Sequence, residues 1–438
     1  GRISVNGKVI RLALGMGFDP NLSARDNIFV NGSILGLSFK QIREAFHKII
    51  EFAELENFIE TRLKFYSSGM VSRLAFSIAI AQAPKAPIGK AKFKDFWGVD
   101  QDSRSISLFI TQYLINHGRM NSPKFLLGES YGTFRNATVM NRLLGQGVAM
   151  NGIIMVSAVF DLRTLMFPPG DDMPYIVHFP TYAATAYYHK KLASSPADID
   201  EFIQEIREFT EQEYMPALFM GDQISQADKS AIATKLGNYT GTDSDYWMKA
   251  DLRVTASEFF AEFLRDEGKT VGRLDSRYTG VSQDGIAQNG AYDPQSSAIS
   301  PAYIQGFLDY FHNTLGVSKD LMYTVTAGRR QGFNWDWSHQ GNAGWGGSMA
   351  AINTGPDMAQ ALTRDPNMKV LIMNGYLDIA TVFYGVEHSI NHLGLPKHIK
   401  DNITMTYYEA GHMMYTDQAS LVKFKEDLAA FVQDALKR

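Results

Sequence analysis

The sequence predicts an α/β protein with a mainly parallel sheet, because short apolar strands alternate with helices along two stretches of the chain. Such alternation is typical of parallel strands joined by helical crossovers. The predicted elements are, in order, strand 124–127, helix 131–144, strand 152–156, strand 368–373, helix 382–393, strand 402–408 and helix 418–436. The 438 residues exceed the size at which one hydrophobic core stops growing, so we expect more than one structural unit, or one oversized domain with an insertion.

The first 80 residues show a helical pattern. Ser23 has Asp26 three residues on, and Ser38 has Gln41 in the same relation, so each pair predicts the capping box that begins a helix. In the second of these helices, apolar residues recur at helical spacing and predict one buried face: Ile42, Phe46, Ile49 and Ala53. A third helix is expected from about residue 70 to residue 80, where the prolines that follow end it.

The alternation of strands and helices lapses between about residues 160 and 345, which are rich in Tyr, Pro and Asp and contain only scattered helical stretches. We therefore expect a long insertion there, which would form a lid over the functional site of the protein. The predicted organisation comprises a helical segment at 1–81, a junction at 82–90, a core at 91–159, the insertion at 160–345 and the returning core at 346–438.

The composition excludes several classes of function. With 42 basic and 46 acidic residues the formal charge is -4, so no positive field favours nucleic acid. The absence of cysteine excludes disulfides, thiolate metal sites and a cysteine nucleophile. No apolar run approaches the roughly 18 residues of a membrane span, and no signal peptide is evident, so we expect a soluble chain that begins within a domain.

The sharpest motif is Gly128-Glu129-Ser130-Tyr131-Gly132, which lies between a predicted strand and a predicted helix. It matches the nucleophile elbow G-x-S-x-G. In that turn, small flanking residues let the backbone lift the serine hydroxyl above the sheet and direct the next N–H toward a developing oxyanion. The alternative is a glycine-rich loop that caps the helix. The placement favours Ser130 as a nucleophile.

A serine hydroxyl is a poor nucleophile at neutral pH and needs an imidazole base, which a carboxylate holds in one tautomer. Beyond Ser130 the sequence supplies Asp378, just after the strand that ends at residue 373, and His412, just after the strand that ends near residue 408. The alternatives are a helix cap for Asp378 and a loop histidine for His412. The order Ser, Asp, His and the position of each at a strand end favour a catalytic triad.

Residues 89–438 resemble the serine carboxypeptidase family, especially its bacterial members. Four stretches carry the resemblance: 94–102 (KDFWGVDQD), 121–132 (NSPKFLLGESYG), 374–378 (NGYLD) and 410–414 (AGHMM). The family implies an α/β-hydrolase fold with Ser130, Asp378 and His412 as triad and the backbone N–H of Tyr131 as one oxyanion donor. It also implies a peptide substrate with a free C-terminal carboxylate, removal of C-terminal residues through an acyl-enzyme, and no metal or organic cofactor.

The same resemblance gives Glu129 the role of recognising the terminal carboxylate of the substrate. Two anionic carboxylates repel each other, so this role requires a protonated Glu129 that donates a hydrogen bond. Burial near another carboxyl group, such as Glu409, would favour the neutral form and shift activity toward acid pH. The alternative is that Glu129 packs beside the elbow and bonds to backbone.

The sequence also departs from this family. Its members carry an upstream Asn-Gly-Gly-Pro-Gly segment, whose backbone supplies the second oxyanion donor. No such segment occurs here, and the residues before Ile88 do not resemble the opening strands of the family. Loss of one oxyanion donor costs about 100-fold to 1000-fold in rate. We therefore expect a hydrolase core without its N-terminal strands, and impaired activity.

Residues 1 to about 81 resemble a different family, the ATP-binding subunits of ABC transporters that export bacterial surface polysaccharides. Three stretches carry this resemblance: 14–20 (LGMGFDP), 25–28 (RDNI) and 66–70 (YSSGM). The last resembles the ABC signature motif, in which Ser68 and Gly69 would offer a hydroxyl and N–H groups to the γ-phosphate of ATP held by a partner subunit. A plain serine helix cap is the alternative for Ser68.

This segment lacks a G-x-x-x-x-G-K-[ST] phosphate loop and a strand ending in Asp-Glu, so it cannot hydrolyse ATP by the mechanism of that family. The sequence leaves three functions open: a serine carboxypeptidase, a truncated transporter subunit that contacts a transporter partner through residues 1–81, and a non-functional fusion. The carboxypeptidase resemblance points to the periplasm or to secretion, whereas the transporter resemblance points to the inner face of the membrane.

Two further clusters complete the candidates. His388 and His392 stand four residues apart, as metal ligands on one helix face do, but a surface or packing role is favoured because no third ligand is evident. Trp335, Trp337 and Trp345 lie late in the insertion, where they either line a peptide cleft or pack within the lid.

Overall fold

The chain forms two compact units, each of which is assembled from separate stretches of sequence. The computed structural model describes residues 18–34, 39–53, 55–66, 70–71, 74, 92–194, 196–319, 333–339 and 352–437. The first unit comprises residues 1–101, 109–120 and 301–335, and the second comprises residues 102–108, 121–300 and 336–438. Part of the predicted insertion therefore belongs to the first unit, and the domain boundaries drawn from the sequence stay predictions.

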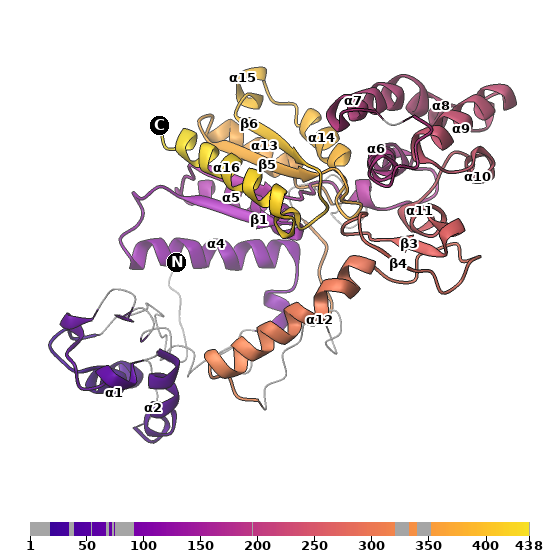
Figure 1. Ribbon diagram of the computed structural model, residues 1–438. Helices are drawn as coiled ribbons and strands as arrows, with labels where there is room; N and C mark the ends of the chain where they lie inside the picture. The colour runs from indigo at the N-terminus through magenta and orange to yellow at the C-terminus, as the bar shows by residue number, and fades with distance from the viewer. Residues whose placement is uncertain are drawn as a thin grey trace. The chain divides into compact units, whose positions relative to one another are not determined.

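The described elements are mostly helical (Figure 1). The helices are α1 (Ala24–Ile34), α2 (Phe39–Ala53), α4 (Val99–Asn116), α5 (Tyr131–Gly145), α6 (Met173–Tyr188), α7 (Ile199–Phe209), α8 (Met215–Met220), α9 (Gln226–Thr240), α10 (Ser244–Lys249), α11 (Ala256–Glu262), α12 (Pro294–Asp309), α13 (Gly355–Arg364), α14 (Phe383–Asn391), α15 (Lys397–Lys400) and α16 (Gln418–Ala435). The strands are β1 (Phe125–Glu129), β2 (Gly152–Val156), β3 (Lys269–Val271), β4 (Thr279–Val281), β5 (Lys369–Gly375) and β6 (Ile403–Tyr408). Within the described residues, no helix has the length and apolarity that crossing a membrane requires.

The N-terminal helices begin where the capping pattern predicts. Ser23 Oγ accepts a hydrogen bond from the Asp26 N–H (3.1 Å) and donates one to the Asp26 carboxylate (2.7 Å), so Ser23 caps α1, which starts at Ala24, although the reciprocal backbone bond of a full capping box is not formed. The periodic face of α2 is buried as predicted and joins α1 in a small core of its own. Most of the predicted third helix lies outside the described residues, as do Ser38 and the candidate nucleotide-binding residues Ser68 and Gly69.

The second unit contains a parallel sheet in the order β1-β2-β5-β6, which confirms the predicted mixed α/β class. Glu129 is in register with Val156, and Val156 with Met373. The carboxyl ends of the strands therefore meet at one edge of the sheet, the edge at which α/β proteins place their ligands. Strand β2 is buried along its whole length, as the uninterrupted apolar run Gly152–Val156 requires in a strand covered on both faces.

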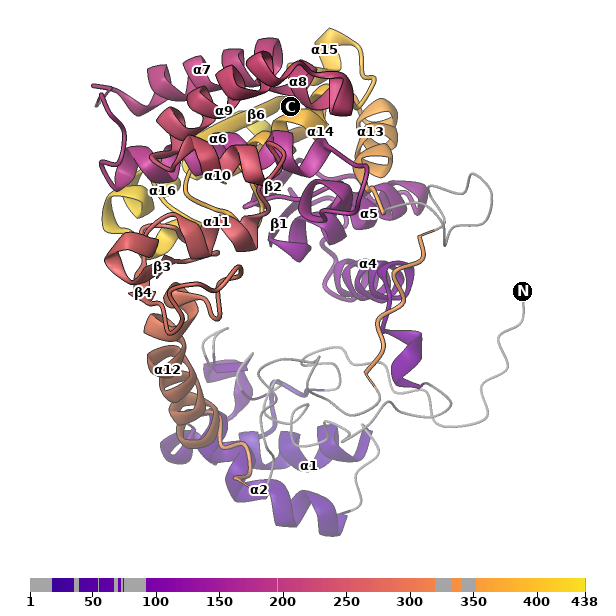
Figure 2. The ribbon, with the colours of Figure 1, turned by 90° about the vertical axis from the view of Figure 1, so that its right-hand side faces the viewer.

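Helices cover both faces of this sheet (Figure 2). On one face α16 packs through Phe424, Leu428 and Phe431 against alternate strand residues, among them Ile154 and Leu371. On the other side α5 contacts β1 and β2, and α13 packs against α5. The result is a three-layer arrangement in which the period-2 alternation of the strands supplies apolar side chains to both helical layers.

The insertion builds a second, larger core beyond the carboxyl ends of the strands. Helices α6 to α11 gather at the end of the sheet toward which the strand arrows point (Figure 1). Their apolar side chains share one cluster with Tyr376, Leu377 and Phe383, which follow β5. The insertion also contains an antiparallel pair, β3 and β4, which the sequence pattern did not indicate because each strand has only three residues.

We predict that replacing Phe179 by Ala lowers the free energy of unfolding by about 3–5 kcal/mol, because a large buried aromatic ring leaves a cavity. Phe179 is fully buried, and its ring lies 5.3 Å from that of Tyr214 and 5.6 Å from that of Phe209. Urea unfolding followed by circular dichroism measures the change.

The control is Phe219→Ala, because the Phe219 side chain is 91% exposed and its loss changes stability by no more than about 0.5 kcal/mol. Equal effects of the two substitutions would contradict the core that the structure assigns to the insertion.

Candidate active site

Ser130 occupies a sharp turn between β1 and α5. Its backbone has φ 55° and ψ -124°, a conformation that L-residues rarely adopt. The Ser130 N–H donates to the Val156 carbonyl (3.0 Å), and its own carbonyl accepts from the Thr133 N–H (2.9 Å) and the Thr133 hydroxyl (2.7 Å). The strained residue is thus fixed on both sides, as the predicted elbow requires.

The small residues of the motif are sterically necessary. A Cβ atom at Gly128 would collide with the Gly132 carbonyl group and come within 2.7 Å of Asn136 Nδ2. The strand and the first turn of α5 therefore approach each other too closely for any residue but glycine at position 128. This close approach is the physical reason for the first glycine of the G-x-S-x-G pattern.

Asp378 and His412 come together after β5 and β6. His412 Nδ1 lies 2.8 Å from Asp378 Oδ2, and both side chains are buried. The other oxygen of Asp378 accepts from the N–H groups of Ala380 (2.8 Å) and Thr381 (3.0 Å), which fixes the carboxylate in a local turn. Helix α14 begins only at Phe383, so Asp378 orients the imidazole rather than capping that helix.

Ser157, just after β2, is bonded to the loops that carry His412 and Asp378. It follows β2 with φ 48°, is buried, and donates its hydroxyl to the His412 carbonyl (2.6 Å). The Ser157 carbonyl also lies 3.0 Å from the Thr381 hydroxyl, which lies 2.7 Å from Asp378 Oδ2 and 3.2 Å from His412 Nδ1. No motif in the sequence signals Ser157 or Thr381.

The described structure shows no hydrogen bond between the Ser130 hydroxyl and His412. Among the described residues, the imidazole forms side-chain hydrogen bonds with Asp378 and Thr381, and none links it to Ser130. Catalytic hydrogen bonds are often long in the absence of substrate and tighten when it binds. The structure therefore brings Asp378 and His412 together after β5 and β6, and places Ser130 at the end of β1, which β2 separates from β5.

The loop between β3 and β4 holds the acid and base loops in place. The Arg273 carbonyl accepts from the Ile379 N–H (3.0 Å), and the Leu274 carbonyl accepts from the His412 N–H (2.6 Å). The Asp275 carboxylate accepts a further hydrogen bond from the Gly411 N–H (3.2 Å). This hairpin of the insertion is thus part of the site, although no motif in its sequence signals that role.

The electrostatic environment keeps His412 available for protonation. Burial lowers the pKa of His412, but the charge and hydrogen bond of Asp378, with a contribution from Glu129, outweigh burial and raise it above its ordinary value of 6.5. A second buried histidine, His178, also lies near Asp378, but its pKa is lowered and not raised. Burial lowers the pKa of His178 to about 4, and its Nδ1 is bonded to the Pro174 carbonyl. Of these two, His412 is the one suited to carry a proton.

Glu129, the last residue of β1, lies beside Tyr415. The Tyr415 hydroxyl is 2.9 Å from one oxygen of the Glu129 carboxyl group and 3.1 Å from the other. The neighbour expected from the sequence was different, because Glu409 is exposed and lines another cleft with Tyr188 and Arg277. Glu129 therefore bonds to a tyrosine side chain rather than to backbone or to a second carboxyl group.

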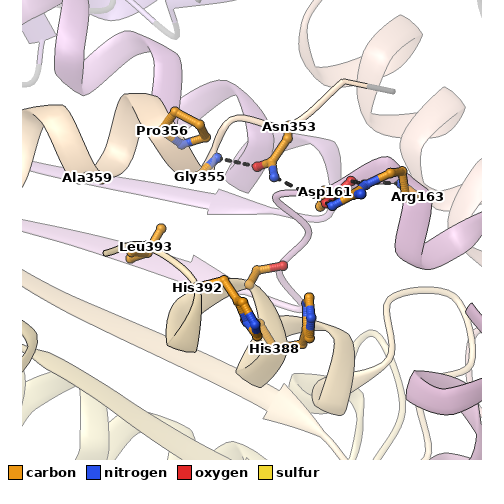
Figure 3. A pocket seen from close by; sticks show the side chains of 10 residues that line it. Asp161, Arg163, Asn353, Gly355, Pro356, Ala359, His388, His392 and Leu393 are labelled. Carbon is orange, nitrogen blue, oxygen red and sulfur yellow. Dashed lines mark hydrogen bonds and ion pairs between the residues drawn. The ribbon is translucent and has the colours of Figure 1, made fainter. Parts of the chain in front are cut away.

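His388 of α14 and His392, which follows the end of that helix, line a separate pocket of about 330 Å³ (Figure 3). The rings of His388 and His392 stack with centroids 4.0 Å apart, and the His392 Nδ1 is bonded to the His388 carbonyl. Asp161 in the same pocket pairs with Arg163 at 2.6 Å. Within the part of the chain that the structure describes, no group of three or more potential ligands could hold a metal ion.

Comparison with known proteins finds relatives for a short part of the chain. No family model matches it. The chain is 45% identical over 85 residues to the ABC transporter protein AbcA of Aeromonas salmonicida, which is 19% of this chain and 28% of that protein. It is 43% identical over 79 residues to an O-antigen export system ATP-binding protein of Klebsiella pneumoniae, 18% of this chain and 32% of that protein. It is 44% identical over 84 residues to a teichoic acids export ATP-binding protein of Lactococcus lactis, 19% of this chain and 18% of that protein.

These matches confirm the resemblance of a segment of about 85 residues to ATP-binding proteins of polysaccharide export. The chain spans less than a third of the length of these relatives. The names of the relatives lend no support to the carboxypeptidase resemblance, which stays a prediction.

We predict that Asp378→Asn moves the pKa of His412 from above 6.5 to below it, because the variant loses the anion that raises the pKa and keeps the burial that lowers it. Titration of the His412 ring protons by NMR measures both values. Since the folded-state pKa is raised, the Asp378–His412 pair stabilises the fold fully below pH 6.5 and loses that effect as the pH rises through the folded value.

The matched control for this titration is Asp357→Asn, which removes the carboxylate from the other buried His–Asp contact, between His339 and Asp357 (2.8 Å). His412 should titrate in this control as in the parent. An unshifted His412 pKa in Asp378→Asn would show that the Asp378 carboxylate does not set it.

Proposed function

We propose that the second unit is a serine hydrolase of the α/β-hydrolase fold that acts as a carboxypeptidase through an acyl-enzyme. One observation carries the proposal: a buried Asp378–His412 hydrogen bond lies at the same edge of a parallel sheet as the strained Ser130 turn. A nucleophile, a base and a carboxylate that orients the base are the parts that this chemistry requires.

In the proposed acylation, His412 accepts the hydroxyl proton of Ser130 while Ser130 Oγ forms a bond to the carbonyl carbon of the substrate. The C–N bond then breaks, and the proton passes from His412 to the leaving amine. Water attacks the resulting ester with His412 again as base, which releases the shortened peptide and restores Ser130. Asp378 holds the Nδ1–H tautomer of His412 and stabilises the imidazolium.

The oxyanion of each tetrahedral intermediate needs N–H donors. Tyr131 directly follows Ser130 and is the first residue of α5, the position from which a backbone N–H faces the oxyanion in a nucleophile elbow. We assign its N–H as one donor. Because the sequence lacks the Asn-Gly-Gly-Pro-Gly segment that supplies the second donor in the family, we expect a rate about 100-fold to 1000-fold below that of a complete enzyme.

Glu129 is the proposed ligand for the terminal carboxylate of the substrate. The Tyr415 hydroxyl, 2.9 Å from the Glu129 carboxyl group, provides a second polar group beside it. The insertion would close over this site as a lid, since its hairpin already bonds to the loops of Asp378 and His412.

We predict that a fluorophosphonate probe labels the parent chain and that Ser130→Ala abolishes labelling. His412→Ala should slow labelling by about 100-fold or more, because the hydroxyl loses its general base. The measurement is in-gel fluorescence over time, with circular dichroism to establish folding. Ser225→Ala, which removes an exposed helix-capping hydroxyl, is the control and should label as the parent does.

Failure to label a folded parent would contradict the hydrolase proposal and favour a non-functional fusion. Labelling that survives Ser130→Ala would place the reactive serine elsewhere.

A second candidate function is a truncated transporter subunit, and the comparisons support it more directly than the first. The observation in its favour is the 43–45% identity over 79–85 residues to ATP-binding proteins of O-antigen and teichoic acid export. We propose that residues 1–81 bind an intact ATP-binding subunit of such an exporter, with Ser68 and Gly69 facing the γ-phosphate of ATP that the partner holds.

This second candidate predicts an ATP-dependent contact at Ser68. The chain contains no cysteine, so Ser68→Cys creates a single thiol. We expect it to cross-link to a cysteine placed at the phosphate loop of a purified O-antigen exporter ATP-binding subunit, and to do so only when ATP is present. Ser225→Cys is the control, and equal cross-linking by the two variants, or no dependence on ATP, would refute the contact.

A further inference from the structure

We propose that the pocket beside α14 binds a small organic anion, a carboxylate with an apolar body, through Arg163 and His388. The volume of this pocket, about 330 Å³, is in the range of small-molecule sites. The pocket lies within the second unit, and none of Ser130, Asp378 and His412 lines it. The inference goes beyond the proposed hydrolase function and does not depend on it.

The two sides of the pocket differ in polarity. Pro356 and Leu393 lie on one side, and Arg163 lies on the other (Figure 3). Ala359 of α13 adds a third apolar side chain to the lining. A molecule that suits both sides has an apolar body and one anionic group, because the apolar side chains shelter the body from water while the guanidinium provides a fixed positive charge.

Arg163 has donors left for a ligand. Its Nε and Nη2 donate to the Asp161 carboxylate at 3.0 and 2.6 Å. Asp161 also accepts from the Arg163 N–H (3.0 Å) and from Asn353 Nδ2 (3.2 Å), so its oxygens are already satisfied. Within the described ranges the Arg163 Nη1 has no acceptor, and the side chain is 51% exposed. A guanidinium with donors in this state can bind a second carboxylate.

His388 is the second donor, because its Nδ1 is buried and has no hydrogen-bond partner among the described residues. Such an atom calls for a ligand or a water. The neighbouring side chains do not satisfy it. His392 stacks on His388 with centroids 4.0 Å apart and directs its own Nδ1 to the His388 carbonyl. The Ser389 hydroxyl donates to the Gly385 carbonyl (2.8 Å).

The charges around His388 make the proposed binding depend on pH. Burial lowers the pKa of His388, His392 and Arg163 lower it as well, and Asp161 opposes them. The unliganded histidine is therefore neutral near pH 7, whereas a bound carboxylate favours the protonated form. Binding then takes up a proton, so the Kd should rise with pH, by up to about tenfold per unit between the pKa values of the unliganded and liganded histidine.

The test measures binding of hexanoate and of hexanamide to the purified full chain by isothermal titration calorimetry at about pH 5.5 and about pH 7.5. The probes share an apolar body and differ in charge, so we expect hexanamide to bind about 10-fold or more weakly than hexanoate at the lower pH. His388→Phe, which keeps a ring to stack on His392, should weaken hexanoate binding there by about 10-fold and remove its pH dependence. Ala359→Leu, which fills the apolar side, should weaken both probes.

The matched control is His398→Phe, the same change at an exposed histidine of α15, which should bind hexanoate as the parent does. Circular dichroism establishes folding, and if His388→Phe does not fold, Ala359→Leu decides alone. Equal binding of the two probes overturns the inference, as does hexanoate binding that the folded pocket variants leave unchanged. Absence of hexanoate binding to the folded parent also overturns it, and leaves the labelling of Ser130 as a separate question.

Discussion

The buried hydrogen bond between Asp378 and His412 is the interaction on which the rest of the site depends. Desolvating a carboxylate is costly unless it is paired and fully hydrogen-bonded. Here the Asp378 oxygens accept from two backbone N–H groups and contact the imidazole and the Thr381 hydroxyl. The two residues follow different strands, so their contact also requires that two loops keep a fixed separation. The β3–β4 hairpin, with backbone bonds to Ile379 and to His412, provides that constraint.

The two units have separate apolar cores, which agrees with the separate resemblances of their sequences. The core of α1 and α2 is built from residues between Ala24 and Leu74, whereas the cores around the sheet and the insertion begin at Ile154 and Val177. Among the described residues, each of these cores is formed by side chains of its own elements. The transporter-like segment and the α/β unit are therefore compatible within one chain.

Much of the second unit follows from local sequence signals. The bounds predicted for Gly152–Val156 agree with those of β2, because a continuous apolar run next to a glycine allows few other structures. The structure brings Asp378 and His412 together, and the catalytic roles expected for them and for Ser130 stay predictions. Ser157 and the hairpin loop could not be predicted, because they act through long-range hydrogen bonds. Ser157 lies 255 residues before the carbonyl to which it donates.

The position of β1 at the end of the described sheet has a consequence for how the molecule opens. Strands β2 and β5 each have two neighbours, whereas β1 is paired with β2 alone, and Leu127 at its centre is exposed. Edge strands separate from a sheet at a lower free energy than interior strands do. Strand β6 is the other end of the described sheet, but the loops of Asp378 and His412 are also bonded to the β3–β4 hairpin. Partial opening at β1 would therefore detach Ser130 while Asp378 and His412 are still held together, so heat or denaturant can separate Ser130 from His412 before the fold is lost.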